Sequence, residues 1–327
     1  MAKKVLTPEQ QEIKSMKKAK SSQNWTKFWA ILLALVLTVG IAFLGRSQGK
    51  KNTADVSTGG TNTPAQTQPA PEESLSRGEN AVSEGETVTD AQGNVTVGLS
   101  KADAVKLLND ATAVAAKGSY DWKRTCEYEK TNGKDLIVTT NSGSDATDTL
   151  DGIIHRVDSN ASLGSVVGGF IGIGSKDGKV KGGKFVADEN GNTPDEKYLL
   201  KAMSLDEASV KDFVQEADVY KFQLNACDNP KKDGGNALHR ATDDFITHEE
   251  VSQGIKDGLG GLSALLSLEK SQVTFSNITI TATIKGGKLT NLELTYDFSA
   301  ELNLKATLVG INGNGKAKTK IVYSNIA

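Results

Sequence analysis

The chain has 327 residues, with 38 Lys and Arg against 40 Asp and Glu, so its formal net charge is −2. Two cysteines are too few for a disulfide-rich miniprotein, and a hydrophobic content of 37% is too low for a polytopic membrane protein. The composition also lacks the excess of positive charge that nucleic-acid-binding domains normally have. Length alone suggests about two domains.

The near-neutral total charge is an average over unlike segments. Residues 1–27 contain seven Lys and two Glu, which gives this stretch a net charge of +5. Residues 45–100 sum to −3 and residues 101–327 sum to −4. This polarity predicts a basic head, residues 1–27, followed by an acidic remainder.

An uncharged apolar stretch from Phe28 to Leu44 separates these parts, and with its neutral flanks it is long enough to cross a bilayer as a helix. Trp25 and Trp29 stand at its N-terminal boundary, where amphipathic rings prefer the lipid headgroups. Because lysines are concentrated before the stretch, we expect a cytoplasmic N-terminus and an extracellular C-terminal domain. The pattern predicts a single-pass transmembrane helix over residues 28–45 that remains in the cell membrane as a signal-anchor.

A cleaved signal peptide is the alternative, because Gly40-Ile41-Ala42 loosely fits a cleavage site. The usual Ala-x-Ala is absent and the apolar run continues past this point, which favours the anchor. The first cysteine after the stretch is Cys126, so a bacterial lipid-modified N-terminus is excluded.

Residues 46–99 are predicted to form a disordered linker. They contain no Ile, Met, Phe, Tyr or Trp, and three of the six prolines of the chain. Such a segment cannot bury enough apolar surface to offset the entropy lost on ordering. The folded part is then one extracytoplasmic domain, residues 100–327.

The start of this domain predicts a helix followed by a β-hairpin. Ser100 and Asp103 form an acidic variant of a capping box, and Gly118 ends the helical spacing of apolar residues that follows. Apolar and mostly charged residues then alternate as in a strand, with the apolar set Tyr120, Trp122, Cys126 and Tyr128. We expect residues 135–140 to pair with this strand across a turn at Asn132-Gly133.

Further helices and one strand are expected between residues 150 and 266. Apolar spacing predicts a helix from Leu150 to Val157, and residues 204–207 resemble a cap for a short third helix. Residues 220–226 alternate as a strand. Thr247 and Glu250 form a capping box, with apolar residues on one face of the helix behind it.

The C-terminal quarter has the strongest strand pattern. Residues 278–284 alternate and end at a Gly286-Gly287 hairpin turn. From Leu292 to Leu308 every even residue is apolar and every odd residue is polar, which indicates one long curved strand or two strands with a bend. Residues 312–315 (Asn-Gly-Asn-Gly) read as a turn into a last strand. The pattern predicts an α+β domain, in which a curved antiparallel β-sheet packs against helices.

Two stretches resemble known families. The helix that leads into Tyr120-Asp121-Trp122 resembles the opening of many bacterial surface lipoproteins, and residues 277–300 (NITITATIKGGKLTNLELTYDFSA) resemble the sheet of half-barrel carriers of the LolA and LprG type. Residues 100–327 are similar to uncharacterised membrane-anchored surface proteins of Clostridia-type bacteria. The resemblance implies a half-barrel that cradles an apolar molecule, with a transmembrane anchor in place of the lipidated cysteine of those carriers.

Glycine-rich motifs are incomplete. The runs from Gly178 to Lys184 and from Gly310 to Lys316 resemble phosphate-binding loops, but the Ser or Thr that would hold magnesium is missing. Hairpin turns explain both runs better. The glycines of residues 168–174 lack dinucleotide-binding spacing and are expected to allow close packing.

Metal-binding and catalytic motifs are also incomplete. Residues 188–192 resemble a calcium loop but lack its Gly and its final Glu, so we expect an ordinary loop. His248-Glu249-Glu250 lacks the second His of a zinc peptidase and is explained by helix capping. With no Gly-x-Ser-x-Gly elbow and no visible Ser/His/Asp cluster, the sequence predicts no catalytic residues, no cofactor, no metal and no enzyme.

The cysteines leave two alternatives open. Cys126 and Cys227 both fall in strand patterns outside the membrane, and a disulfide that closes so long a loop would be stabilising. Cys227 has the opposite parity from Tyr220 and Phe222 on its strand, whereas Cys126 shares the parity of Trp122, which argues for two free thiols.

The functional expectation is a membrane-tethered extracytoplasmic binding module for a lipid or other apolar ligand, with a possible cell-wall or surface partner and no nucleic acid. The expected ligand-binding residues lie on the apolar parity of the sheet: Trp122, Leu292, Leu294, Tyr296, Phe298, Leu302 and Leu304. The alternative is a structural or adhesive cell-surface protein, in which the same side chains form a filled core without a ligand.

Overall fold

The computed structural model describes residues 74–78, 81–89, 93, 95–140, 142–148, 151–152, 155, 159–160, 162–259, 266–306 and 309–327. The predicted basic head, the predicted transmembrane helix and the first part of the predicted linker lie outside these residues. Most of the helix expected from Leu150 to Val157 also lies outside them. Within the described residues, no helix has the length and apolar character needed to cross a membrane.

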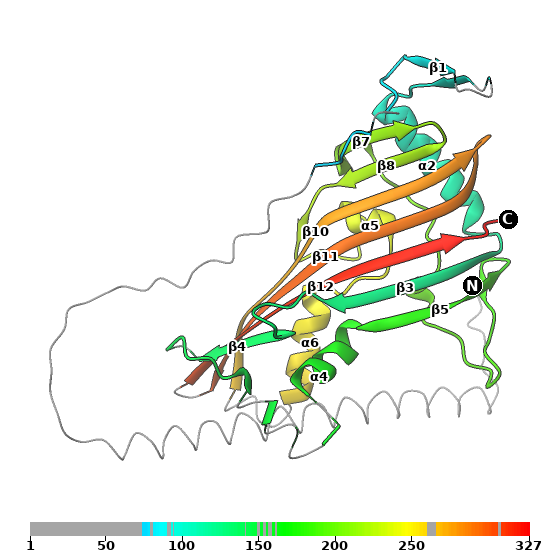
Figure 1. Cartoon of the computed structure of the whole chain (residues 1–327). Helices are drawn as coiled ribbons and strands as arrows, with labels where there is room; N and C mark the ends of the chain where they lie inside the picture. Colours follow the sequence, from blue (N-terminus) through cyan, green and yellow to red (C-terminus); the bar gives the residue numbers. More distant parts are fainter. Residues whose placement is uncertain are drawn as a thin grey trace, which may run out of the picture.

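Most of the described chain forms one open, antiparallel sheet, while helices are few (Figure 1). This confirms the expected antiparallel sheet with helices against it. The order across the sheet is β6 (Lys184–Phe185), β5 (Gly174–Lys181), β3 (Tyr120–Tyr128), β12 (Val309–Ser324), β11 (Lys288–Ala306), β10 (Leu266–Lys285), β8 (Val219–Leu224) and β7 (Val210–Glu216). Two short strands pair off this path, β4 (Leu136–Thr140) with β12 and β9 (Cys227–Asp228) with β10.

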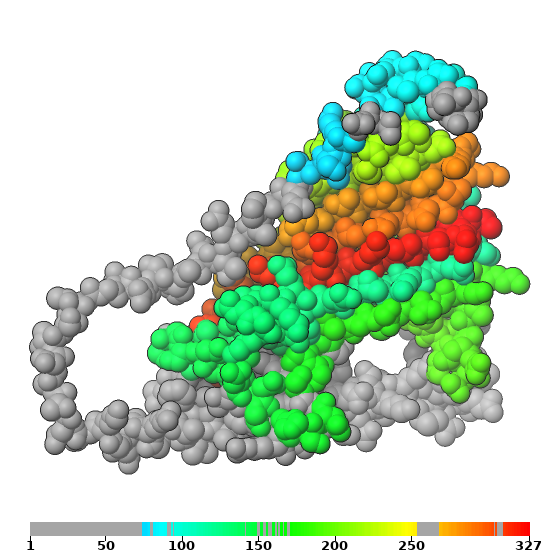
Figure 2. All heavy atoms as spheres, viewed as in Figure 1, coloured from blue at the N-terminus to red at the C-terminus, as the bar shows by residue number. Residues whose placement is uncertain are grey.

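Three long strands, β10, β11 and β12, form the centre of the sheet. Gly286 and Gly287, at φ 54° and 76°, make the predicted two-residue turn between β10 and β11. β11 is one continuous strand, so the two-strand alternative for residues 292–308 is wrong over the described part. Figure 2 shows the outer side chains of these strands as adjacent bands on the face toward the viewer.

The expected turn at residues 312–315 is wrong. These residues lie inside β12, where Gly313 pairs with Leu302 on one side and with Val138 of β4 on the other. Gly315 allows close packing here, because a Cβ at this position would come within 2.5 Å of a methyl carbon of Leu136 and would force that side chain to shift. Of the glycines that suggested a turn, Gly315 makes room for Leu136 of β4, whereas Gly313 has open space around it.

The partner expected for residues 135–140 is also wrong. β4 pairs with β12 rather than with β3, and β3 and β4 lie end to end along the same edge of β12. A strand as long as β12 has enough free edge for both, which local turn signals do not indicate.

The helices lie on the inner face of the sheet and are capped largely as predicted. α2 (Lys101–Ala115) begins at Ser100, whose side chain accepts a hydrogen bond from the backbone N–H of Asp103. α4 (Leu163–Ile171) and α5 (Ala237–Ala241) are shorter. α6 (His248–Leu259) has the predicted capping box, in which Thr247 and Glu250 each accept from the other's backbone N–H.

One expected helix is shorter than predicted. Residues 204–207 do not begin an α-helix; Asp206 caps a single 3₁₀ turn, Glu207–Ser209. The chain enters β7 directly afterwards, so there is no room for a longer helix.

The last part of the predicted disordered linker has structure. β1 (Thr87–Thr89) and β2 (Val95–Val97) form a small antiparallel pair. The N–H of Val82 donates to the carbonyl of Gln215 on β7, and the buried Gln215 side chain accepts from the N–H of Leu99 at 2.9 Å and donates to the carbonyl of Val97. Gln215 thus supplies hydrogen-bond partners for the backbone of this segment, which has few apolar side chains to hold it in place. The folded domain therefore begins before residue 100.

Candidate functional site

The predicted ligand-binding side chains lie on the inner face of the sheet, most of them in the apolar core. Leu292, Leu294, Tyr296 and Trp122 are at most 2% exposed, and Phe298 is 7% exposed. Leu302 is partly buried and packs against the core. The Leu304 side chain lies outside the described residues.

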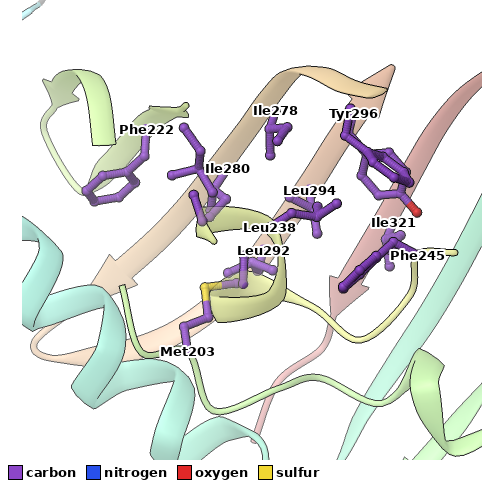
Figure 3. Close-up of a cluster of buried hydrophobic side chains, with 14 of the residues drawn as sticks. Met203, Phe222, Leu238, Phe245, Ile278, Ile280, Leu292, Leu294, Tyr296 and Ile321 are labelled. Atoms are coloured by element: carbon purple, nitrogen blue, oxygen red, sulfur yellow. The ribbon is translucent and has the colours of Figure 1, made fainter. Parts of the chain in front are cut away.

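The inner face has two unlike halves. In the first half, α2 packs on β10 and β11, and α5 and the segment near Met203 close the face. Figure 3 shows Leu292 and Leu294 facing Leu238 of α5, with Met203 beside Leu292. This half is a packed core.

In the second half, some apolar side chains toward the far ends of the long strands are only partly buried, although Ile311 and Val138 are buried. α6 packs on β10 here, while β4 lies along β12 at its Gly313–Leu302 register position. The partly buried apolar side chains come from β10, β11, β4 and α4: Leu268, Ala300, Leu302, Leu136 and Val167. We call this set the distal apolar face.

A buried ion pair lies between the sheet and the segment before α6. Arg124 Nε donates to Asp244 Oδ2 at 2.5 Å, with side chains only 4% and 3% exposed. Arg124 Nη1 donates to the carbonyl of Gly172 at 2.6 Å, and the Tyr296 hydroxyl donates to the carbonyl of Asp244 at 2.5 Å. This network fixes the end of α4 and the segment before α6 to β3 and β11.

The ion pair sets the electrostatics of the core. Burial is the largest influence on Arg124 and opposes its charge, but the Asp244 carboxylate, with smaller contributions from Tyr296 and Cys126, outweighs it, so the arginine pKa is raised above its ordinary value. Burial, and then the Asp244 charge, raise the pKa of Tyr296 well above its ordinary value. Arg124 therefore stays charged and Tyr296 stays neutral at any physiological pH. The network has a structural role, because the charges of Arg124 and Asp244 are already paired with each other.

Sequence reasoning missed this pair, although one signal was present. Arg124 has the same strand parity as Trp122 and Cys126, so an inward charge was implied by the alternation itself. Its partner Asp244 is 120 residues away in a connecting segment, and no local pattern links the two.

The structure brings together a Ser–His cluster that the sequence did not reveal. Ser271 on β10 lies with its Oγ 2.7 Å from His248 Nδ1 and 2.9 Å from Ser252 Oγ on α6. Ser271 faces Leu302 across the β10–β11 register, so this cluster borders the distal apolar face. In the described part of the chain no carboxylate contacts His248, so the cluster lacks the orienting acid of a catalytic triad.

His239 of α5 has a structural role. Its Nδ1 accepts from the N–H of Gly234 at 2.6 Å, and its Nε2 lies 3.2 Å from an oxygen of Asp243. Burial, and then the nearby Lys201 ammonium, lower the pKa of His239. The neutral imidazole therefore holds the loop before α5 in place.

The two cysteines are free thiols. Cys126 on β3 and Cys227 on β9 are separated by β12, β11 and β10 in the sheet, a distance of about 19 Å at the usual strand spacing. A disulfide needs Cα atoms within about 7 Å, so this fold excludes the Cys126–Cys227 bridge.

The remaining motifs have ordinary structural roles. Gly182 and Gly183 form the hairpin turn between β5 and β6 as predicted, whereas Gly310 lies within β12. Gly172, at φ 78°, ends α4. The Asp188 carboxylate accepts from the backbone N–H groups of Asn190 and Asn192 within its own loop.

No group of three or more His, Cys, Asp or Glu side chains in the described ranges is placed to hold a metal ion. No protein-family model, no curated protein and no solved structure matches this chain. Its function has to be inferred from the chemistry of its own residues.

Proposed function

We propose that the protein is a membrane-tethered extracytoplasmic binding module for an apolar ligand such as a lipid, and that the ligand lies on the distal apolar face. The supporting observation is the contrast between the two halves of the inner face. Leu292 and Leu294 in the first half are fully buried, whereas Leu268, Ala300 and Leu302 in the second half are not. A group of apolar side chains that remain partly exposed is typical of ligand sites.

The rest of the proposal concerns shape and location. The open antiparallel sheet, with α2 and α6 packed on its long strands, supports a half-barrel of the LolA and LprG type. The apolar stretch from Phe28 to Leu44, with lysines before it, supports a single-pass signal-anchor that keeps this domain outside the cell.

The test is direct extraction of the ligand. Residues 74–327 are produced in a bacterial host, purified without detergent, extracted with organic solvent and analysed by mass spectrometry. We expect a reproducible lipid at near-stoichiometric amount, and its loss in Leu302→Gln. Glu301→Gln is the matched control, because residue 301 is next in the strand and faces the opposite side of β11.

A structural or adhesive protein is the second candidate, favoured by the dense packing of the first half. It predicts an extract without lipid from a folded domain, together with no binding of an added fluorescent fatty acid. That pair of results would replace the carrier proposal with the structural one.

A further inference from the structure

The indole N–H of Trp122 has no hydrogen-bond acceptor, although the residue is 2% exposed. Buried polar groups in folded proteins almost always have a partner, because an unpaired donor loses its hydration without compensation. Among the buried side-chain nitrogen atoms of the described residues, Trp122 Nε1 is the one without a hydrogen-bond partner. The chain itself therefore supplies no acceptor for this N–H.

The indole nitrogen lies above the backbone of Gly178 on β5. Trp122 and Gly178 are direct partners in the β3–β5 register, and a Cβ on Gly178 would come within 3.0 Å of Trp122 Nε1. Gly178 is half-buried, and only the two-residue strand β6 lies beyond β5 in the sheet. The glycine therefore lets the indole nitrogen lie close against the backbone of β5, near the edge of the sheet.

Two lysines converge on the same aromatic cluster. The Tyr198 ring stacks on Trp122 with centroids 5.5 Å apart. Lys176, two residues before Gly178 on the same face of β5, donates to the Tyr198 hydroxyl at 3.1 Å, and its Nζ is 4.9 Å from the ring centroid. Lys197 Nζ is 5.1 Å from that centroid. Such contacts hold ammonium groups in position over an aromatic ring.

The charges in this cluster are unbalanced. Arg124 also approaches the Tyr198 ring, but its charge is neutralised by Asp244. Across the described ranges, the contacts of Lys176 and Lys197 are with the Tyr198 side chain rather than with a carboxylate. Two unpaired ammonium groups and one unpaired indole N–H supply donors only, and the complementary group is an anion with several acceptor lone pairs.

We propose that Trp122, Lys176, Lys197 and Tyr198 form a binding site for an anionic group, a carboxylate or a phosphate. The indole N–H donates to one oxygen of the anion, and the lysines supply the charge. Phe185 packs against the indole, with ring centroids 5.4 Å apart and the rings tilted. This site lies on β3, β5 and the 3₁₀ turn Glu196–Tyr198 and is independent of the distal apolar face.

The test follows the indole N–H itself in the full chain. The protein contains three tryptophans, so Trp25→Phe combined with Trp29→Phe leaves Trp122 as the sole indole. In a neutral detergent, its ¹H–¹⁵N signal is followed by NMR during titration with acetate, inorganic phosphate or glycerol 3-phosphate, against sodium chloride at equal ionic strength. We expect a saturable downfield shift with carboxylate or phosphate and none with chloride. A response to glycerol 3-phosphate that is stronger than that to free phosphate identifies an esterified phosphate as the natural group.

Variants separate this site from general charge effects. Lys176→Gln should weaken the apparent affinity by about tenfold, since it removes a charge-assisted contact. Lys184→Gln, an exposed lysine on β6, should leave the affinity unchanged. The proposal is overturned if no anion shifts the indole signal, which would make a buried water the acceptor. It is also overturned if Lys176→Gln binds the anion as tightly as the parent and as Lys184→Gln.

Discussion

The buried pair of Arg124 and Asp244 gives the sharpest prediction about stability. Asp244→Asn keeps the shape of the side chain but removes its charge, which leaves a guanidinium 4% exposed with only neutral acceptors. Removing one partner of a buried pair costs about 3–5 kcal/mol, because the remaining charge is desolvated without compensation. A typical domain has about 5–15 kcal/mol of stability, so the change removes a large part of it.

The assay is urea unfolding of residues 74–327 followed by circular dichroism, with the free energy of unfolding from linear extrapolation. Asp110→Asn is the control, since it breaks the exposed Lys106–Asp110 pair at 2.6 Å, and we expect little change there. Arg124→Met combined with Asp244→Leu leaves no lone charge and should cost less than either single change. The reasoning is refuted if Asp244→Asn costs no more than the control, or if the double variant loses the sum of the single losses.

Three further predictions concern other contacts. Gly315→Ala should destabilise the domain by about 1–3 kcal/mol because its Cβ would meet Leu136, whereas Gly313→Ala, with open space, should be neutral in the same urea assay; equal effects would contradict the packing explanation. The lowered pKa of His239 means that the unfolded state binds its proton more readily, so the free energy of unfolding should fall as pH decreases through the ordinary histidine pKa of about 6.5. His239→Gln should flatten that slope, and an unchanged slope would exclude this residue as its source. Gln215→Leu should speed amide hydrogen exchange at residues 95–99 without affecting β11, and unchanged exchange there would show that the buried amide is not what holds this segment.

Local chemistry was sufficient to predict elements whose signals lie within a few residues of each other. The caps at Ser100 and Thr247 begin helices as expected, and the paired glycines at 286 and 287 form the hairpin turn. In each case the residues that determine the local structure are neighbours in the sequence.

Features that depend on distant partners could not be predicted. The glycines at 313 and 315 have the composition of a turn, and only the pairing of β4 with β12 shows that they lie inside a strand. The same holds for the candidate sites. The unpaired indole of Trp122 is visible only once Gly178 and Tyr198 are placed beside it, although Trp122 itself was predicted to bind ligand.

The position of β12 has a consequence for how the protein is made. β12 is a central strand that β3 needs as a neighbour, and Thr319 contacts Cys126 across 193 residues of chain. Contacts so distant in sequence make folding slow and leave the edge of β3 open until β12 has been synthesised. A chain truncated before β12 should therefore expose this edge and be a substrate for proteolysis.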